Sequence, residues 1–218
     1  MTASSVVLRA VCSAVVVCGL VACSSLPRPP DAVVRYDLGV APALVATSAA
    51  AQAPIALAAM QAPLQAEGST ALRYRLAYAD AQVLHAYTQA RWSLPPAQMV
   101  QQRLREHLSA GGRVVLAADP GEIPPRVQGR HVPVLHLALE EFSHVFRNPQ
   151  DSEGWVRVRA TLVDPAPEGD VLLAQQLFEV RQGAAAANAA AGAQALSAAV
   201  GRLGQELRQW LAGVLATR

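Results

Sequence analysis

Cysteine is scarce in this sequence, and its three cysteines, Cys12, Cys18 and Cys23, all lie near the N-terminus. From Ser24 onward there is no thiol, which excludes disulfides and thiolate metal sites from any domain folded there. Lysine is absent, so the basic side chains are arginines, and the formal net charge is only +2. The chain therefore lacks the strongly basic footprint of a nucleic-acid-binding protein.

Catalytic signatures are also missing. The sequence contains no G-x-S-x-G elbow, no P-loop and no G-x-G-x-x-G motif. Glu140 and Glu141 are neighbours, and neighbours on a strand face opposite ways, which does not suit a shared general acid and base. Ser93 precedes a proline pair and is better explained as a helix-entry residue than as a nucleophile. We predict no enzyme and no catalytic residue; a hydrolase with an unrecognised site is an alternative.

His136, Glu140 and His144 could suggest a metal site, but their spacing argues against it. On a strand the two histidines would be about 26 Å apart, and on a helix about 12 Å apart. A single ion cannot bridge either distance. We predict no metal and no cofactor.

The first 22 residues are predicted to be a secretory signal peptide. Arg9 supplies a positive charge, the segment Ala10–Ala22 is apolar or small throughout, and no acidic residue precedes Asp31. The apolar run is shorter than the ~20 residues that a membrane-spanning helix needs. A retained transmembrane anchor is the alternative.

The residues Leu20, Val21, Ala22 and Cys23 resemble the bacterial lipobox. This resemblance implies cleavage before Cys23, a diacylglycerol on its sulfur and an acyl chain on its new amino group. Three acyl chains would hold the protein firmly at a membrane. An ordinary signal peptide with a chance cysteine is the alternative.

Residues 23–32 are predicted to be the lipidated cysteine and a tether. The tether is polar and rich in proline, which favours an extended backbone. Similarity to sorted lipoproteins adds an inference from Ser24 and Ser25, because an aspartate there would be expected for inner-membrane retention. We predict an outer-membrane, lipid-anchored, periplasm-facing protein.

Residues 33–218 are predicted to form a single α+β domain. Alternating apolar and polar residues, or short apolar runs, indicate strands. The expected strands are residues 33–40, 55–60, 71–78, 82–92, 113–120, 131–146, 155–164 and 171–180. Because several connections are too short for crossover helices, we expect a mainly antiparallel sheet.

Two amphipathic helices are expected on one face of this sheet. The first opens at Pro95 and Pro96, buries Val100, Leu104 and Leu108, and ends at the glycine pair 111–112. The second is the C-terminal helix, whose apolar stripe has three- and four-residue spacing. Its Ala-rich start would allow the helix to begin as early as Ala184, although Gly183 and Gly192 disfavour that extension. A coiled coil is the alternative.

Two arginine pairs are the candidate contact residues. Arg73 and Arg75 share one strand face, and so do Arg157 and Arg159. Guanidinium groups suit lipid phosphates and acidic protein partners alike. A merely solvated sheet face is the alternative.

The order of these pieces resembles the ABC-type transport auxiliary lipoproteins, the family of the PqiC (YmbA) lipoproteins. The likeness rests on a lipobox, an early "YDLG" strand, "ARWSLPP", the helix "AQMVQQRLREHL", "LALEEF", the hairpin "VRVRATL…LLAQQLFEV" and a closing "LRQWL". The Ala/Pro-rich stretch 41–63 departs from the pattern.

This resemblance implies an accessory part of a lipid-transport system that crosses the bacterial envelope, acting by docking and without catalysis. The implied partners are a substrate-binding protein of the mammalian-cell-entry (MCE) type and an inner-membrane ABC permease or ATPase. A homo-oligomeric ring would also fit the family. A periplasmic lipid-binding carrier is the alternative, although few aromatic residues and Ala-rich helices disfavour a large pocket.

Overall fold

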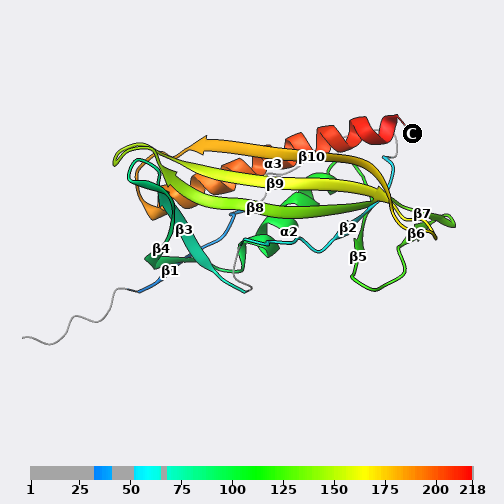
Figure 1. Cartoon of the computed structure of the whole chain (residues 1–218), viewed down its shortest axis with the longest axis horizontal. Coiled ribbons are helices and arrows are strands. Elements are labelled where there is room, and N and C mark those ends of the chain that lie inside the picture. The colour runs from blue at the N-terminus through cyan, green and yellow to red at the C-terminus, as the bar shows by residue number, and fades with distance from the viewer. Residues whose placement is uncertain (1–31, 41–51, 65–67, 218) are drawn as a thin grey trace, which may run out of the picture. The chain divides into compact units, whose positions relative to one another are not determined.

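The computed structural model describes residues 32–40, 52–64 and 68–217. Val33–Arg218 forms one compact unit, in which helices cover a long, twisted sheet (Figure 1). In chain order the elements are β1 (Val34–Tyr36), β2 (Ile55–Ala58), β3 (Ala71–Leu76), β4 (Asp80–Trp92), α2 (Pro96–Ser109), β5 (Val115–Ala118), β6 (Arg126–Val127), β7 (Arg130–His131), β8 (Val134–Phe146), β9 (Ser152–Asp164), β10 (Val171–Gly183) and α3 (Ala189–Ala216).

Strand β8 organises the eight-stranded sheet. One of its edges pairs along its whole length with β9, which in turn pairs with β10. The other edge is divided between two partners. The start of β8 pairs with β2, which continues to β5, whereas its last residues, 144–146, pair with β3, which continues to β4 and β1. The small β6–β7 hairpin forms a separate two-stranded sheet.

The α+β class is confirmed, but the expectation of a mainly antiparallel sheet is wrong. Four of the seven pairings in the large sheet are parallel, namely β1–β4, β2–β5, β2–β8 and β3–β8. Short connections force antiparallel order only on strands that follow each other in the chain. Each parallel pair joins strands that are separated by other elements, so the connection lengths did not constrain it.

The helix ends follow local sequence signals. Helix α2 has Pro95 at its N-cap and Pro96 in its first turn, and the left-handed Gly111 and Gly112 follow it, with φ of 81° and 86°. Helix α3 begins at Ala189 rather than 184, because the Asn188 side chain caps it by accepting a hydrogen bond from the Ala191 amide at 2.9 Å. Within the described residues no helix is long and apolar enough to cross a membrane.

Both helices share one hydrophobic core with the same face of the sheet. Helix α3 contacts β8, β9 and β10, and α2 packs against α3. The largest fully buried side chains are mostly leucines from every layer, including Leu57, Leu72, Leu104, Leu135, Leu162, Leu196 and Leu203, together with Ile55 and Trp92. The space between helices and sheet is therefore filled by side chains.

Glycines allow α3 to approach its neighbours closely. A Cβ at Gly192 would lie 2.6 Å from Cγ of His144, and one at Gly204 would lie 2.6 Å from Cγ of His107. On β9, a Cβ at Gly154 would lie 2.6 Å from the backbone nitrogen of Leu196. All three distances are shorter than real Cβ contacts, so a side chain at any of these positions would push α3 outward.

Candidate functional site

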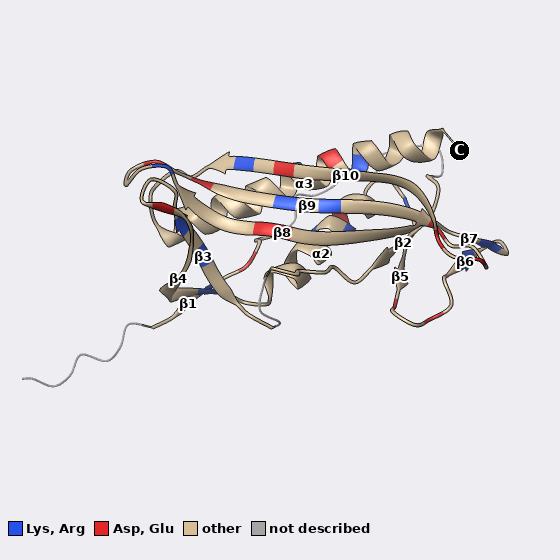
Figure 2. Cartoon of the chain, in the orientation of Figure 1, with Lys and Arg blue, Asp and Glu red and all other residues tan. Residues whose placement is uncertain are grey.

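The predicted arginine pair on β9 meets a glutamate from β8, and Figure 2 shows the charged segments of these two strands side by side. Arg157 Nε donates to one oxygen of Glu140 at 2.9 Å, and Arg159 Nε donates to the other at 2.7 Å. Val156, Val158 and Ala160, which alternate with these residues, are fully buried toward the helices. The two-residue alternation of a strand thus predicted which way the arginine pair faces, but not that both arginines bind the carboxylate of Glu140.

The Glu140 carboxylate leaves the outer ends of both guanidinium groups accessible. Its own side chain is 15% exposed, whereas those of Arg157 and Arg159 are 36% and 41% exposed. None of the described residues accepts a hydrogen bond from their terminal nitrogens. Two oriented, partly solvated guanidinium forks suit an incoming carboxylate or phosphate.

The other predicted pair, on β3, is not arranged in this way. Arg75 forms an ion pair with Glu141 at 2.9 Å and also donates to the carbonyls of Ala81 and Gln82 at 3.3 and 3.5 Å. Arg73 forms no ion pair with any described residue. Both β9 arginines therefore bind Glu140, whereas on β3 only Arg75 binds a glutamate, Glu141.

An irregularity in β8 makes these glutamate contacts compatible. The register between β8 and β9 shifts between Leu139 and Glu141, which is the mark of a β-bulge. Glu140 can then reach across to β9 while its neighbour Glu141 reaches β3 on the other side. The two carboxylates are held by arginines, so they serve as ion-pair partners in the described structure.

A second ion-pair group was not predicted. Arg181 on β10 contacts Glu153 at 2.8 Å and Glu179 at 3.1 Å, and its guanidinium carbon lies 4.1 Å from the ring centre of Trp155. In the sequence, the alternating charged residues of β10 and of the start of β9 could have indicated this ion-pair group. In these ion pairs, four arginines of β3, β9 and β10 meet four glutamates of β8, β9 and β10.

The histidines of the suspected metal set do not converge. His144 is completely buried, and its Nδ1 lies 2.9 Å from the Tyr87 hydroxyl, whereas His136 is exposed. Burial lowers the pKa of His144 from 6.5 to about 4, and burial raises the pKa of Tyr87. No group of three His, Cys, Asp or Glu among the described residues could hold a metal ion.

Ser93 is neither a nucleophile with a base beside it nor the cap of α2. Its hydroxyl donates to the sulfur of Met99 at 3.7 Å, and its amide donates to the Tyr36 carbonyl at 2.7 Å. The cap position belongs to Pro95, and no side chain caps the helix. The interpretation of Ser93 as a helix-entry residue is therefore corrected: it links the end of β4 to β1. Cys23, the predicted lipidation site, lies outside the described residues, as does most of the tether.

The fold and these surfaces define an α+β domain with ion-paired arginines on its sheet and a packed core. The family model of the ABC-type transport auxiliary lipoprotein components matches residues 36–208. The chain belongs to this family, as its sequence resemblance indicated, and is thus an auxiliary lipoprotein of ABC-type transport.

Solved structures share the fold at low sequence identity. A DUF330 protein from Xanthomonas campestris is 17% identical with a TM-score of 0.60, and the match covers 74% of this chain and 84% of that one. An uncharacterised protein is 11% identical with a TM-score of 0.59, covering 83% and 99%. No curated protein compared with the chain matches it significantly.

Proposed function

We propose that the protein is the accessory lipoprotein of an MCE/ABC-type system that transports lipids across the bacterial envelope. Its partners would be an MCE-domain substrate-binding protein and an inner-membrane ABC permease or ATPase. The family match over residues 36–208 carries this proposal, because that family serves ABC-type transport. Lipid attached to Cys23 would hold the domain at the outer membrane, facing the periplasm.

The packed core favours docking over carrying. Leucines from both helices and from β8 and β9 fill the layer between helices and sheet, which is where a carrier would hold an acyl chain. The role proposed is accordingly structural, without catalysis and without a cofactor other than the acyl groups on Cys23. A homo-oligomeric ring is part of the same proposal.

The arginine pairs remain the proposed contact residues. Arg157 and Arg159 are the better placed, because Glu140 orients them while their outer ends stay accessible. Arg73 stays in the proposed set, whereas Arg75 is already held by Glu141. An acidic surface on the partner or a lipid phosphate would satisfy their remaining donors.

Affinity purification of the tagged, lipidated protein from membranes in mild detergent tests the function, with co-eluting proteins identified by mass spectrometry. We expect an MCE-domain protein together with its permease or ATPase. Recovery of the protein alone would contradict the proposal, and recovery with stoichiometric lipid would favour the carrier. Native mass spectrometry of the same sample tests the ring.

A matched pair of variants tests the contact residues in this assay. Arg157→Gln with Arg159→Gln should reduce partner recovery. Arg202→Gln, which removes an exposed arginine from α3, should leave it unchanged. Equal recovery from both variants would remove the β9 pair from the interface.

A further inference from the structure

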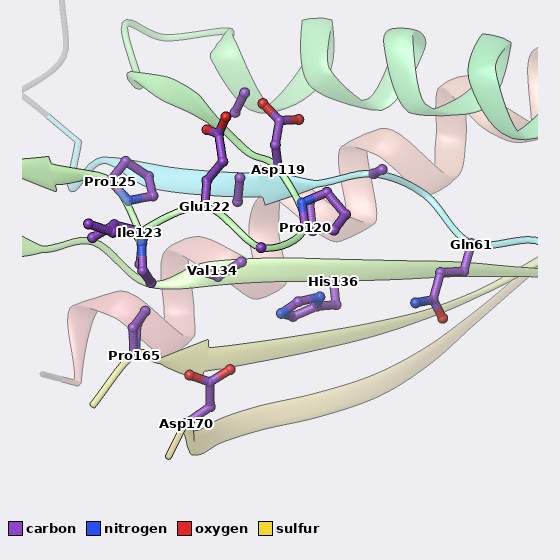
Figure 3. A pocket seen from close by; sticks show the side chains of 16 residues that line it. Gln61, Asp119, Pro120, Glu122, Ile123, Pro125, Val134, His136, Pro165 and Asp170 are labelled. Atoms are coloured by element: carbon purple, nitrogen blue, oxygen red, sulfur yellow. The ribbon is translucent and has the colours of Figure 1, made fainter. Parts of the chain in front are cut away.

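A pocket of about 400 Å³ opens where β2 and β5 end (Figure 3), and Figure 1 shows β5 at the end of the sheet away from β1. Its walls are the loop 119–125 that follows β5, the β8 residues Val134 and His136, and the β9–β10 turn. The loop contains Pro120, Gly121, Pro124 and Pro125, which restrict its backbone or turn it.

The pocket floor is apolar and made of small residues. Alanines 58, 59, 117 and 118 from the ends of β2 and β5 line it. A second small core supports this floor, in which Ala58 and Val134 pack with Ala56, Val132 and Val163. At the rim, Ile123 is 84% exposed. A space of this size above alanines can accept one apolar side chain of a ligand.

Three carboxylates surround this apolar floor. Figure 3 shows Asp119 and Glu122 on one side of the pocket and Asp170 on the other. None of the three forms an ion pair with a described basic side chain, and no arginine of the described chain lines the pocket. By contrast, the glutamates on the outer sheet face are all paired with arginine. The pocket thus carries unbalanced negative charge in a chain whose net charge is positive.

The charge and the lining of the pocket indicate which class of ligand fits it. The described residues hold no group of three side chains suited to a metal ion, so a divalent cation is not the expected occupant. Negative rims repel phosphate and carboxylate, which disfavours an anionic lipid headgroup. An organic cation attached to an apolar group complements both the apolar floor and the negatively charged rim.

The position of the pocket suits a partner protein. The pocket adjoins the start of β8, whereas β3, β4 and β1 join its other end, about 30 Å away at ~3.3 Å per residue. The described part of the chain begins at residue 32, just before β1. The ten residues from Cys23 to Val33 can span at most about 36 Å. If Cys23 is lipidated, which is part of the proposed function, the pocket lies at the end opposite the tether attachment.

We propose that this pocket binds a short segment of a partner protein in which an apolar side chain is flanked by arginine or lysine. The apolar side chain would enter over Ala59 and Ala117. The basic side chains would pair with Asp119 and Glu122 on one side and with Asp170 on the other. Such a site adds a specific docking point to the more diffuse contacts proposed for β9.

Selection from a random heptapeptide library tests the proposal, using the lipidated full chain in detergent as bait. Dissociation constants of the enriched peptides are then measured by fluorescence anisotropy. We expect enrichment of Arg or Lys next to Leu, Ile, Met or Phe. If the enriched peptides lack this pattern, the proposal is wrong.

Three variants locate the binding. Neutralising Asp119, Glu122 and Asp170 together (Asn, Gln and Asn) should weaken binding about tenfold, at roughly twofold per exposed carboxylate. Ala59→Phe, at an exposed position on the floor, should abolish it. Glu206→Gln removes an exposed carboxylate from α3, away from the pocket, and should change the affinity less than twofold.

The outcomes separate this proposal from the proposed function. Peptide affinity that is equal in the triple variant and the Glu206→Gln control would reject the pocket, even if Ala59→Phe failed to fold. Co-purification of an MCE-domain protein with the triple variant as efficiently as with the unchanged chain would also reject it, while leaving the docking function intact. Specific peptide binding without any co-purified transporter would support the pocket and contradict the function.

Discussion

Replacing Gly192 by alanine should destabilise the protein, although alanine is the better helix former. Gly192 lies within α3 and faces the buried ring of His144, so the added methyl group would lie only 2.6 Å from Cγ of that ring. The ring has little room to move, because Tyr87 binds its Nδ1 at 2.9 Å and Phe146 lies 4.4 Å away between ring centres. The helix must therefore shift.

The magnitude follows from two opposing contributions. Overpacking a well-filled core destabilises by about 1–3 kcal/mol, whereas replacing an interior helix glycine by alanine stabilises by about 0.5–1 kcal/mol. The net expectation is a loss of about 1–2 kcal/mol. For a domain of this size, each kcal/mol corresponds to a fall in Tm of about 2–4 °C.

A glycine on the same helix supplies the control. Among the described residues, a Cβ at Gly201 would meet no atom within 4 Å beyond its chain neighbours and the backbone of its own helix, so Gly201→Ala should stabilise the protein by up to about 1 kcal/mol. Urea unfolding followed by circular dichroism gives both free energies of unfolding. Equal stabilisation by the two substitutions would refute the close approach of α3 to β8.

A double mutant identifies the cause. In a His144→Ala background the ring is gone, so Gly192→Ala should become neutral or stabilising. If Gly192→Ala destabilises this background as much as the unchanged protein, the clash with His144 is not the reason, and the packing argument fails.

Three further predictions concern acid stability, the outer sheet face and the anchor. Because burial lowers the pKa of folded His144 from 6.5 to about 4, the unfolded chain takes up this proton first, and stability should fall as pH drops from about 6.5 to about 4. Urea unfolding across this pH range should show a smaller slope for His144→Phe, and an unchanged slope would contradict the assignment. Glu140→Gln leaves Arg157 and Arg159 without their shared carboxylate and should lower the unfolding free energy by about 1 kcal/mol, an effect that should shrink in 1 M salt. Cys23→Ala should move the protein from the membrane to the soluble fraction after cell fractionation, and persistent membrane attachment would count against the lipobox.

Local patterns predicted the elements better than their pairing. The proline entry and glycine exit of α2 and the alternation of β3 are read within a few residues, and the structure has both elements there. The parallel contacts of β2 depend instead on residues far along the chain, because β2 pairs with β5 and β8. Gly192 shows the same limit: its helix propensity is a local property, whereas the reason for a glycine is the His144 ring on β8.

The candidate contact surface was predictable to the same extent. Alternation placed Arg157 and Arg159 away from the core, and both are indeed partly exposed. Their contact with Glu140 depends on the pairing of β8 with β9 and on a bulge after Leu139. A strict two-residue alternation does not predict such a bulge. With the bulge, one glutamate orients two arginines and the next glutamate holds Arg75. A charge pattern that the sequence alone could not distinguish from a solvated face is therefore an ordered surface, in which the outer ends of the β9 arginines stay accessible.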